Sequence, residues 1–168
     1  MARVPSVDPT QPPTAVEKAM RKFAMSKPGT AFAMKVSTRI DPVLLKLTNG
    51  RFSTGMGFPI VLLTVAGRKS GIERTVPLVY FTQEDEVILI ASSFGRAKNP
   101  AWYLNLTAAG EATLIGGGVE ARYSVRGTEG AERERLFGLA EQLYAGYGLY
   151  KTRAGDRVIP VLALTPIA

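Results

Sequence analysis

The fold is decided by the stretch Pro59-Ile-Val-Leu-Leu-Thr-Val-Ala-Gly-Arg-Lys-Ser-Gly71 and its continuation, Arg74-Thr-Val-Pro-Leu-Val-Tyr-Phe81. The two apolar parts of this stretch are rich in β-branched residues, which is typical of buried strands. Between them lies a basic turn flanked by glycines, which is too short to hold a crossover helix. The sequence therefore predicts two antiparallel strands joined as a hairpin.

Further apolar segments with short connections follow this hairpin. The predicted strands are 87–91, 111–115, 119–126 and 158–164, with turns at 83–85 and 116–118. A short helix is predicted at 100–106, and a longer one after Thr128, which is its expected cap. Because most neighbouring strands are joined by short turns, an antiparallel sheet or barrel is favoured over a doubly wound parallel sheet. The predicted fold class is α+β, mainly β, with flanking helices.

The N-terminal third has a different character. Residues 1–13 contain four prolines and no apolar periodicity, which predicts a disordered or loosely packed tail. Residues 14–57 are predicted to form a helical extension, in which Thr14 caps a first helix. A second apolar stripe runs from Phe32 to Leu47, with a kink or restart at Pro42. Residues 58–168 then form the β domain.

Two residue types are missing from the composition. The chain has 168 residues, 46% of them hydrophobic, and it contains neither histidine nor cysteine. One globular domain is expected at this length. The missing types exclude disulfides, thiolate nucleophiles, Ser-His-Asp triads and zinc sites of the Cys or HExxH kind. An enzyme of this composition must take its chemistry from carboxylates, lysines, tyrosines, hydroxyls or a bound cofactor.

The positive charge is concentrated near the N-terminus. Lys and Arg number 21 against 14 Asp and Glu, a net charge of +7, and residues 1–60 hold nine of the basic and three of the acidic side chains. The remainder is nearly balanced and shows no basic and aromatic stacking motif, so nucleic acid is not an expected partner. The basic N-terminal helix either caps the barrel or docks on anionic lipid, and both alternatives stay open. Without a secretory core or a long apolar run, the expected location is cytoplasmic, either free or peripheral on the inner face of the membrane.

The hairpin turn is the first candidate site. Arg68, Lys69 and Arg74 supply three cations, Ser70 supplies a hydroxyl, and the glycines at 67 and 71 allow backbone N–H groups to turn toward a ligand. An anionic group such as a phosphate or carboxylate needs this combination. The alternative is an ordinary solvated basic turn.

Two further groups of residues could carry chemistry. One is the loop from Ala91 to Gly95 with the following Lys98, Asn99 and Trp102. It combines hydroxyls with the start of a helix, which suits an acceptor-rich ligand. The alternative is an ordinary loop with Trp102 in the core. Tyr144, Tyr147 and Tyr150 are three residues apart and favour stacking on a planar substrate or proton donation; the alternative is core packing.

Several blocks, in order, carry a resemblance to a known family. They are Pro59-Ile-Val-Leu-Leu-Thr64, Gly67-Arg-Lys-Ser-Gly71, Arg74-Thr-Val-Pro-Leu78, Val87-Ile-Leu-Ile-Ala-Ser92, Asn99-Pro-Ala-Trp-Tyr-Leu-Asn-Leu106 and Arg157-Val-Ile-Pro160. Together they resemble the deazaflavin-dependent nitroreductases and F420H2-dependent quinone reductases of mycobacteria and related actinobacteria. The resemblance implies a split β-barrel, like that of FMN-binding pyridoxamine-phosphate-oxidase-type proteins, with coenzyme F420 in a groove beside it.

The same resemblance implies roles for individual residues. Leu62, Leu63 and Thr64 would line the deazaflavin, Val76, Pro77 and Leu78 would pack on its ring system, and Arg68, Lys69, Ser70, Gly71 and Arg74 would hold its phosphate and oligoglutamate tail. The other side would be closed by Ala91, Ser92, Ser93, Phe94, Gly95, Lys98, Asn99 and Trp102. Substrate contacts would come from Ser92, Val79, Tyr144, Tyr147 and Tyr150. The chain departs from the family at Val79, where the family has a tyrosine, and at Ser93-Phe94, where a Lys-Gly pair is common.

The resulting hypothesis is an F420H2-dependent reductase. It would transfer hydride from C5 of the reduced deazaflavin to a quinone, nitroaromatic or other electron-poor acceptor. Ser92 and Tyr144 or Tyr147 are the catalytic candidates, which would hydrogen-bond the anion that forms or relay its proton. The alternatives are an FMN-binding oxidoreductase of the same barrel type and an F420 carrier without proficient turnover. The expected partner is a small-molecule acceptor, menaquinone-like or nitroaromatic, and a monomer is favoured.

Overall fold

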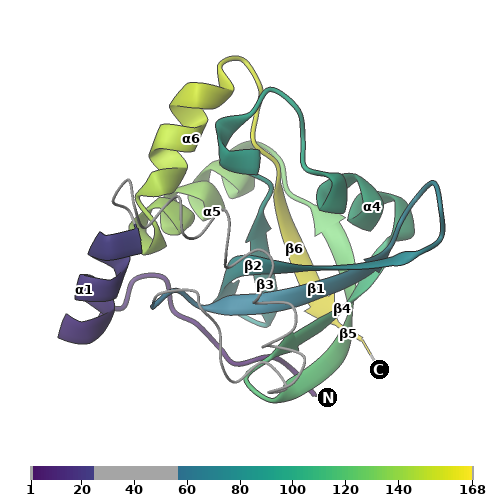
Figure 1. Cartoon of the computed structure of the whole chain (residues 1–168), viewed down its shortest axis with the longest axis horizontal. Helices are drawn as coiled ribbons and strands as arrows, with labels where there is room; N and C mark the ends of the chain where they lie inside the picture. Colours follow the sequence, from purple (N-terminus) through teal and green to yellow (C-terminus); the bar gives the residue numbers. More distant parts are fainter. Residues whose placement is uncertain (1, 25–56, 168) are drawn as a thin grey trace.

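The protein is described by a computed structural model, which covers residues 2–24 and 57–167. Within these ranges six antiparallel strands close into a barrel in the order β1-β2-β3-β6-β5-β4 (Figure 1). The strands are β1 (Ile60–Ala66), β2 (Glu73–Gln83), β3 (Glu86–Ile90), β4 (Glu111–Gly116), β5 (Val119–Gly127) and β6 (Val161–Pro166). The helices are α1 (Ala15–Ala24), the 3-10 turn η2 (Ser93–Gly95), α4 (Ala101–Ala109), α5 (Gly130–Leu143) and α6 (Gly146–Ala154). The predicted antiparallel barrel with flanking helices is confirmed.

The β1–β2 hairpin forms as the sequence predicts. Its register runs from the pair Ile60 and Val79 to the pair Ala66 and Glu73. β2 pairs with β3 only from Tyr80 onward, so in the first half of β2 the described sheet has a neighbour on one side alone. Pro77 lies in that half, where its missing N–H removes no hydrogen bond from a second neighbour.

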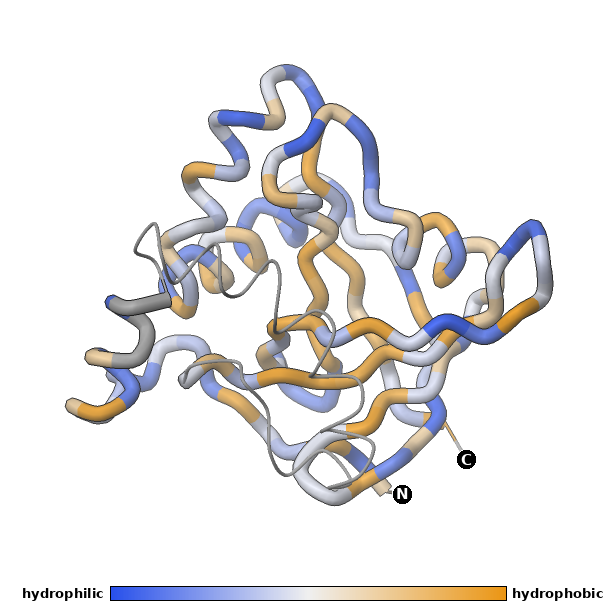
Figure 2. The backbone as a smooth tube through the Cα atoms, viewed as in Figure 1, coloured by the Kyte–Doolittle hydropathy of each residue, from blue (hydrophilic) through white to orange (hydrophobic). Residues whose placement is uncertain are grey.

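Side chains alternate along the strands and feed two apolar clusters. The barrel interior includes Val61, Leu63, Leu89, Leu114 and Leu162. α4 covers part of this interior, because Leu106 is fully buried there and Trp102 and Tyr103 pack beside it. The second cluster lies on the outside, where Phe81 and Ile88 pack against α5 and α6. Figure 2 shows β1, β3 and β6 as largely hydrophobic segments.

Residues 2–9, here called the N-terminal strap, lie against the barrel, which differs from the predicted disordered or loosely packed tail. Val4 is buried in the interior cluster, and its N–H donates to the Tyr123 hydroxyl at 2.9 Å. The Tyr80 hydroxyl donates to the Pro5 carbonyl at 3.0 Å. Composition predicts disorder because prolines supply few donors and little apolar surface. Tyr80 in β2 and Tyr123 in β5 supply the hydrogen-bond partners and the apolar contacts that the strap lacks.

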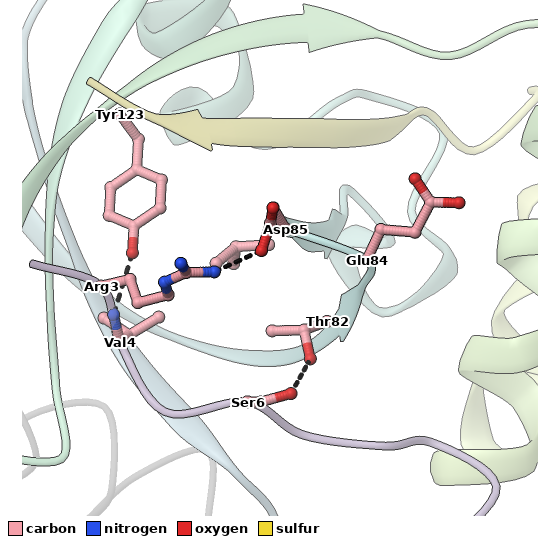
Figure 3. A pocket seen from close by; sticks show the side chains of 8 residues that line it. Arg3, Val4, Ser6, Thr82, Glu84, Asp85 and Tyr123 are labelled. Carbon is pink, nitrogen blue, oxygen red and sulfur yellow. Dashed lines mark hydrogen bonds and ion pairs between the residues drawn. The ribbon is translucent and has the colours of Figure 1, made fainter. Parts of the chain in front are cut away.

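The strap is also tied to the β2–β3 turn. Thr82 donates its N–H to the Val7 carbonyl at 2.9 Å, and the Ser6 and Thr82 hydroxyls are 2.9 Å apart. Arg3 forms an ion pair with Asp85. These contacts border a pocket of about 190 Å³, whose lining is drawn in Figure 3. The figure shows the Arg3 side chain directed at Asp85 and the Tyr123 hydroxyl directed at the Val4 backbone, so these polar groups bind one another, whereas the Glu84 carboxylate points away from them.

α1 begins where the sequence predicts. The Glu17 carboxylate accepts from the Thr14 N–H at 2.8 Å, and the Glu17 N–H donates to the Thr14 hydroxyl at 3.3 Å, which is a capping box. The second predicted stretch, 32–47 with its kink at Pro42, lies outside the described residues, as does most of the extension predicted for 14–57. No helix in the described parts of the chain is long and apolar enough to cross a membrane.

One local prediction around α5 is wrong. Thr128 does not cap this helix, because its hydroxyl donates to the Val161 carbonyl in β6 at 3.0 Å, and Glu129 takes the cap position without a side-chain bond. The Tyr/Gly-rich segment that follows forms the helix α6. Burial of Tyr147 and Tyr150 against the barrel stabilises this helix in spite of its glycines.

Candidate functional site

The hairpin turn is stiffened by its own backbone. The N–H groups of Gly67, Ser70 and Gly71 all donate within the turn, to Ile72 or Gly67 carbonyls 2.7–3.1 Å away. The Ser70 hydroxyl accepts from the Ile72 N–H at 3.3 Å. Gly71 has a φ of +68°, which favours glycine. These amides are therefore not turned toward a ligand, contrary to the sequence-based expectation, and binding at this turn depends on side chains.

The three cations of the turn are exposed and lack carboxylate partners. Within residues 2–24 and 57–167, no ion pair involves Arg68, Lys69 or Arg74. Other arginines differ, since Arg122 pairs with Glu111 and Arg126 pairs with two glutamates. Asn105 of α4 fixes the turn from the side by accepting from the Arg68 N–H at 3.2 Å. The result is a rigid turn that presents three uncompensated positive charges.

The predicted ring-binding residues divide between the two faces of the β1–β2 sheet. Leu62 and its partner Pro77 lie on the outer face, where Leu62 also packs against Ile115. On the same face the Thr64 and Thr75 hydroxyls are 2.9 Å apart. In contrast, the side chains of Leu63, Val76 and Leu78 belong to the barrel interior. Leu63 is fully buried, so a ligand beside the barrel can touch it only through its backbone, whereas Val76 and Leu78 are half-buried.

The loop after β3 holds two residues in a strained conformation. Ser93 and Phe94 have φ values of +51° and +56°, a region that non-glycine residues rarely adopt. Such strain persists where the surroundings over-determine the backbone, and it gathers at functional sites. Gly95 is buried against α6, so close that an added Cβ would lie 2.6 Å from the Arg153 Cβ. Phe94 packs edge-on against Tyr150 at 5.7 Å.

The rest of this loop is held by an arginine that we did not single out as a site residue from the sequence. Arg157 donates to the carbonyls of Ala91, Ser92 and Arg96 and to the Asn99 side chain. Ser92 is half-buried and Lys98 is exposed. Trp102 packs against the barrel interior, which agrees with the core role considered for its indole. One sequence signal pointed to Arg157: it begins the last block that carries the family resemblance, Arg157-Val-Ile-Pro160.

The three tyrosines meet at the junction of α5 and α6. The Tyr144 and Tyr150 hydroxyls are 3.0 Å apart, and the Tyr144 and Tyr147 rings pack edge-on at 5.2 Å. Phe58 packs on Tyr144 at 5.0 Å, a contact that the sequence reasoning missed. Burial raises the pKa of Tyr147 and of Tyr150. Both phenols therefore stay protonated at neutral pH and can donate hydrogen bonds, but they cannot act as bases.

These residues form two groups on the molecule. The hairpin turn projects past α4 (Figure 1), to which Arg68 is bound. The loop of residues 91–99 lies against α6, close to the tyrosines. From the hairpin turn, the outer face of β1 and of the first half of β2 extends along the outside of the barrel. No cluster of metal-ligating side chains occurs in the described segments.

Comparison with known proteins identifies the family. The family of F420H(2)-dependent quinone reductases matches residues 36–166. The chain belongs to this family. This confirms the family that the sequence blocks resemble, the oxidoreductase class and the coenzyme F420. The alternative of an FMN-binding oxidoreductase is not supported.

Individual relatives agree with this family. A Mycobacterium tuberculosis protein named provisionally as an F420H(2)-dependent quinone reductase is 34% identical over 116 residues, which is 67% of this chain and 97% of that protein. A solved F420-H2 dependent reductase, FDR-A, is 37% identical with a TM-score of 0.58, over 63% of this chain and 93% of its own. A second structure, described as a domain-swapped dimer, is 33% identical with a TM-score of 0.60, over 75% and 95% of the two chains.

The chemistry of the residues fits F420. This coenzyme carries a phosphodiester and several carboxylates, and the hairpin turn offers three cations that the described part of the protein does not neutralise. A neutral flavin ring alone does not need such a turn. The individual binding and catalytic residues stay predictions.

Proposed function

We propose that this family member binds F420H2 along the outer face of β1 and β2, between the basic hairpin turn and the loop of residues 91–99, and reduces a quinone-type acceptor beside the tyrosines. The observation that carries the proposal is the rigid turn with the uncompensated cations of Arg68, Lys69 and Arg74. When bound, the deazaflavin supplies a hydride from C5 to the acceptor.

The hairpin turn would hold the acidic part of the coenzyme. Arg68 and Arg74 can each bind a phosphate or carboxylate through two N–H groups, whereas Lys69 adds a compact charge. Because the turn is fixed by its backbone bonds and by Asn105, little backbone conformational entropy of the turn is lost when the tail binds. Lys98, which is exposed on the other loop, adds a further positive charge.

The outer face of the hairpin strands would contact the ring system. Pro77 is half-buried and supplies apolar surface there, with the fully buried Leu62 packed behind it, and Thr64 supplies a hydroxyl that is already paired with Thr75. Leu63, Val76 and Leu78 would act through their backbone and by filling the barrel behind the ring. The ring would thus rest on a surface that the barrel core keeps rigid.

Ser92 and Tyr144 would serve the acceptor. A quinone gains negative charge on its oxygen during reduction, and a hydroxyl directed at that oxygen stabilises the charge or supplies the proton. Tyr144 is half-buried and bonded to Tyr150, so its proton can be replaced through the second phenol. The aromatic faces of this cluster suit a planar acceptor, menaquinone-like or nitroaromatic, and Tyr147, Tyr150 and Val79 would line its site.

Titration with three ligands tests the proposal without turnover. We expect quenching of Trp102 fluorescence by F420 at a Kd about tenfold or more below that of FMN. The deazaflavin riboside, which lacks the phosphate and the oligoglutamate, should bind more weakly than F420, and only F420 binding should weaken steeply with salt. Equal affinity for F420 and the riboside would contradict the role of the hairpin turn. Steady reduction of a menaquinone analogue then separates a reductase from a carrier.

Oligomeric state and membrane contact stay predictions. The relative described as a domain-swapped dimer makes a dimer the main alternative to the predicted monomer, and light scattering after gel filtration distinguishes the two.

Val16 of α1 is 70% exposed, and Lys18 and Lys22 are exposed as well. If α1 docks on lipid, a variant with Lys18→Glu and Lys22→Glu should lose co-sedimentation with anionic liposomes; equal sedimentation would contradict membrane contact through α1.

A further inference from the structure

Arg157 binds the loop after β3 through most of its hydrogen-bond donors. It lies between α6 and β6, and its guanidinium has four acceptors. Nε donates to the Arg96 carbonyl at 2.8 Å, Nη1 to the Ala91 carbonyl at 3.3 Å and the Asn99 Oδ1 at 2.7 Å, and Nη2 to the Ser92 carbonyl at 2.7 Å. All four acceptors are uncharged oxygens, three of them backbone carbonyls and the fourth the Asn99 side chain, so these contacts are hydrogen bonds and not ion pairs.

The acceptors lie on both sides of the strained residues. Ala91 and Ser92 precede Ser93 and Phe94, the pair with positive φ, and Arg96 follows them. A residue in this backbone region is strained, and the conformation persists only where the surrounding structure holds it. One planar group that is bonded before and after the pair fixes the separation of the two ends. The loop is then unable to relax by unwinding from either side.

Only an arginine side chain meets the geometry. Its guanidinium carries five N–H donors in a rigid plane, and the four contacts above use donors on three different nitrogens. A lysine in this position keeps the charge but has a single nitrogen, which cannot reach acceptors on opposite sides of the loop at once. The contacts therefore depend on the shape of the group and not on its charge alone.

We propose that Arg157 is a positioning residue for the coenzyme site: it holds the loop of residues 91–99 in the conformation that presents Ser92 and Lys98 to the ligand. This inference deepens the proposed function and rests on it. Arg157 itself touches neither coenzyme nor acceptor in this proposal, because its described donors face the loop backbone and Asn99. Its removal acts through the loop.

The test compares Arg157→Lys with Arg135→Lys, a matched change of an exposed arginine on α5 whose described side-chain bond is to Gln83. Amide hydrogen exchange of peptides from residues 91–99 is measured first, without ligand, and the Kd for F420 is measured next by fluorescence. For Arg157→Lys we expect exchange about tenfold faster in this loop and a Kd about tenfold higher, with other peptides unchanged. Arg135→Lys should match the wild type in both measurements.

The outcomes separate this inference from the proposed function. Unchanged loop exchange in Arg157→Lys overturns the inference. Faster exchange with an unchanged Kd also overturns it, but leaves the proposed function standing. If the wild type itself does not bind F420, the proposed function fails and the coenzyme role of Arg157 fails with it. Should Arg157→Lys not fold, Asn99→Ala removes one acceptor only, and faster loop exchange without ligand is again the expected result; unchanged exchange contradicts it.

Discussion

The N-terminal strap and the β1–β2 hairpin turn are both polar segments rich in proline or glycine, and the backbone of each forms several hydrogen bonds within the protein. In the strap, Val4 and Pro5 bind the hydroxyls of Tyr123 and Tyr80, and Arg3 pairs with Asp85. In the hairpin turn, the backbone groups bind one another. The two segments differ in their charges, because the cations of the hairpin turn have no carboxylate partner in the part of the chain that is described.

The difference separates a structural segment from a binding segment. A strap whose buried backbone groups and Arg3 bind within the protein stabilises the fold. Residues 68–74 hold three cations and one carboxylate, Glu73, and the repulsion among the cations is a cost that a bound polyanion would relieve. Changes in the strap should therefore alter stability, and changes in the hairpin turn should alter coenzyme binding.

The largest expected effect is on the hairpin turn. The triple variant Arg68→Ala, Lys69→Ala and Arg74→Ala should raise the Kd for F420 about 100-fold at low salt, because three charge-assisted contacts to the tail are lost. The dependence of Kd on salt should flatten at the same time. Fluorescence titration at several salt concentrations measures both.

The same variant tests the other half of the comparison. Its melting temperature should equal that of the wild type, since these side chains form no ion pair in the described structure. The triple variant Arg3→Ala, Arg122→Ala and Arg135→Ala removes equal charge elsewhere and should retain the salt dependence. A Kd that rises equally in both triple variants would indicate a general charge effect instead of a tail site.

Gly117→Ala should be the most destabilising single change on the strap side. Gly117 has a φ of +60°, and an added Cβ would lie 2.1 Å from the Pro5 Cγ, so the strap must move away from the barrel. We expect a loss of about 2–3 kcal/mol in the free energy of unfolding, measured in urea. Gly110→Ala is the matched control, because its φ is +74° but no atom lies within 4 Å of the added Cβ. It should lose about 1 kcal/mol, from the backbone alone.

Alkaline pH should weaken the strap through Tyr80. Burial raises the pKa of Tyr80 from 10.0 to about 12. The unfolded chain therefore loses this proton from about pH 10, whereas the folded protein keeps it, so stability is full below pH 10 and falls as the pH rises toward 12. About 2 kcal/mol should be lost over this range, by urea unfolding at stepped pH. Tyr80→Phe should show a flatter pH profile, and an unchanged slope would contradict this assignment.

The sequence predicted the β1–β2 hairpin and the start of α1 well because their signals are local, whereas closure of the barrel followed from the family resemblance. The β-branched run before the hairpin turn, the glycines at its ends and the Thr14 to Glu17 capping box all act within a few residues of the chain. The strap was missed because its order depends on Tyr80 and Tyr123, which are distant in sequence. Thr128 was misassigned for a similar reason, since the Val161 carbonyl competes with the helix for its hydroxyl.

The candidate site was predictable in type but not in detail. The cluster of basic residues at the hairpin turn is visible in the sequence, and so is the spacing of the tyrosines. Strand alternation alone would have placed Leu63, Val76 and Leu78 in the barrel, away from the outer face. The role of Arg157 was not accessible from composition, because it depends on carbonyls brought together by the fold.

The smallest effects should distinguish a buried bond from an exposed one within the strap. Tyr123→Phe removes the acceptor of the Val4 N–H, which then stays buried without a partner, and should cost about 1–2 kcal/mol in urea unfolding. Asp85→Asn breaks the ion pair with Arg3. The Arg3 side chain is 59% exposed and the Asp85 side chain 74%, so the change should cost about 0.5 kcal/mol or less. If Asp85→Asn were the more costly, the strap would be held by charge and not by its buried backbone, and its contrast with the hairpin turn would lose its physical basis.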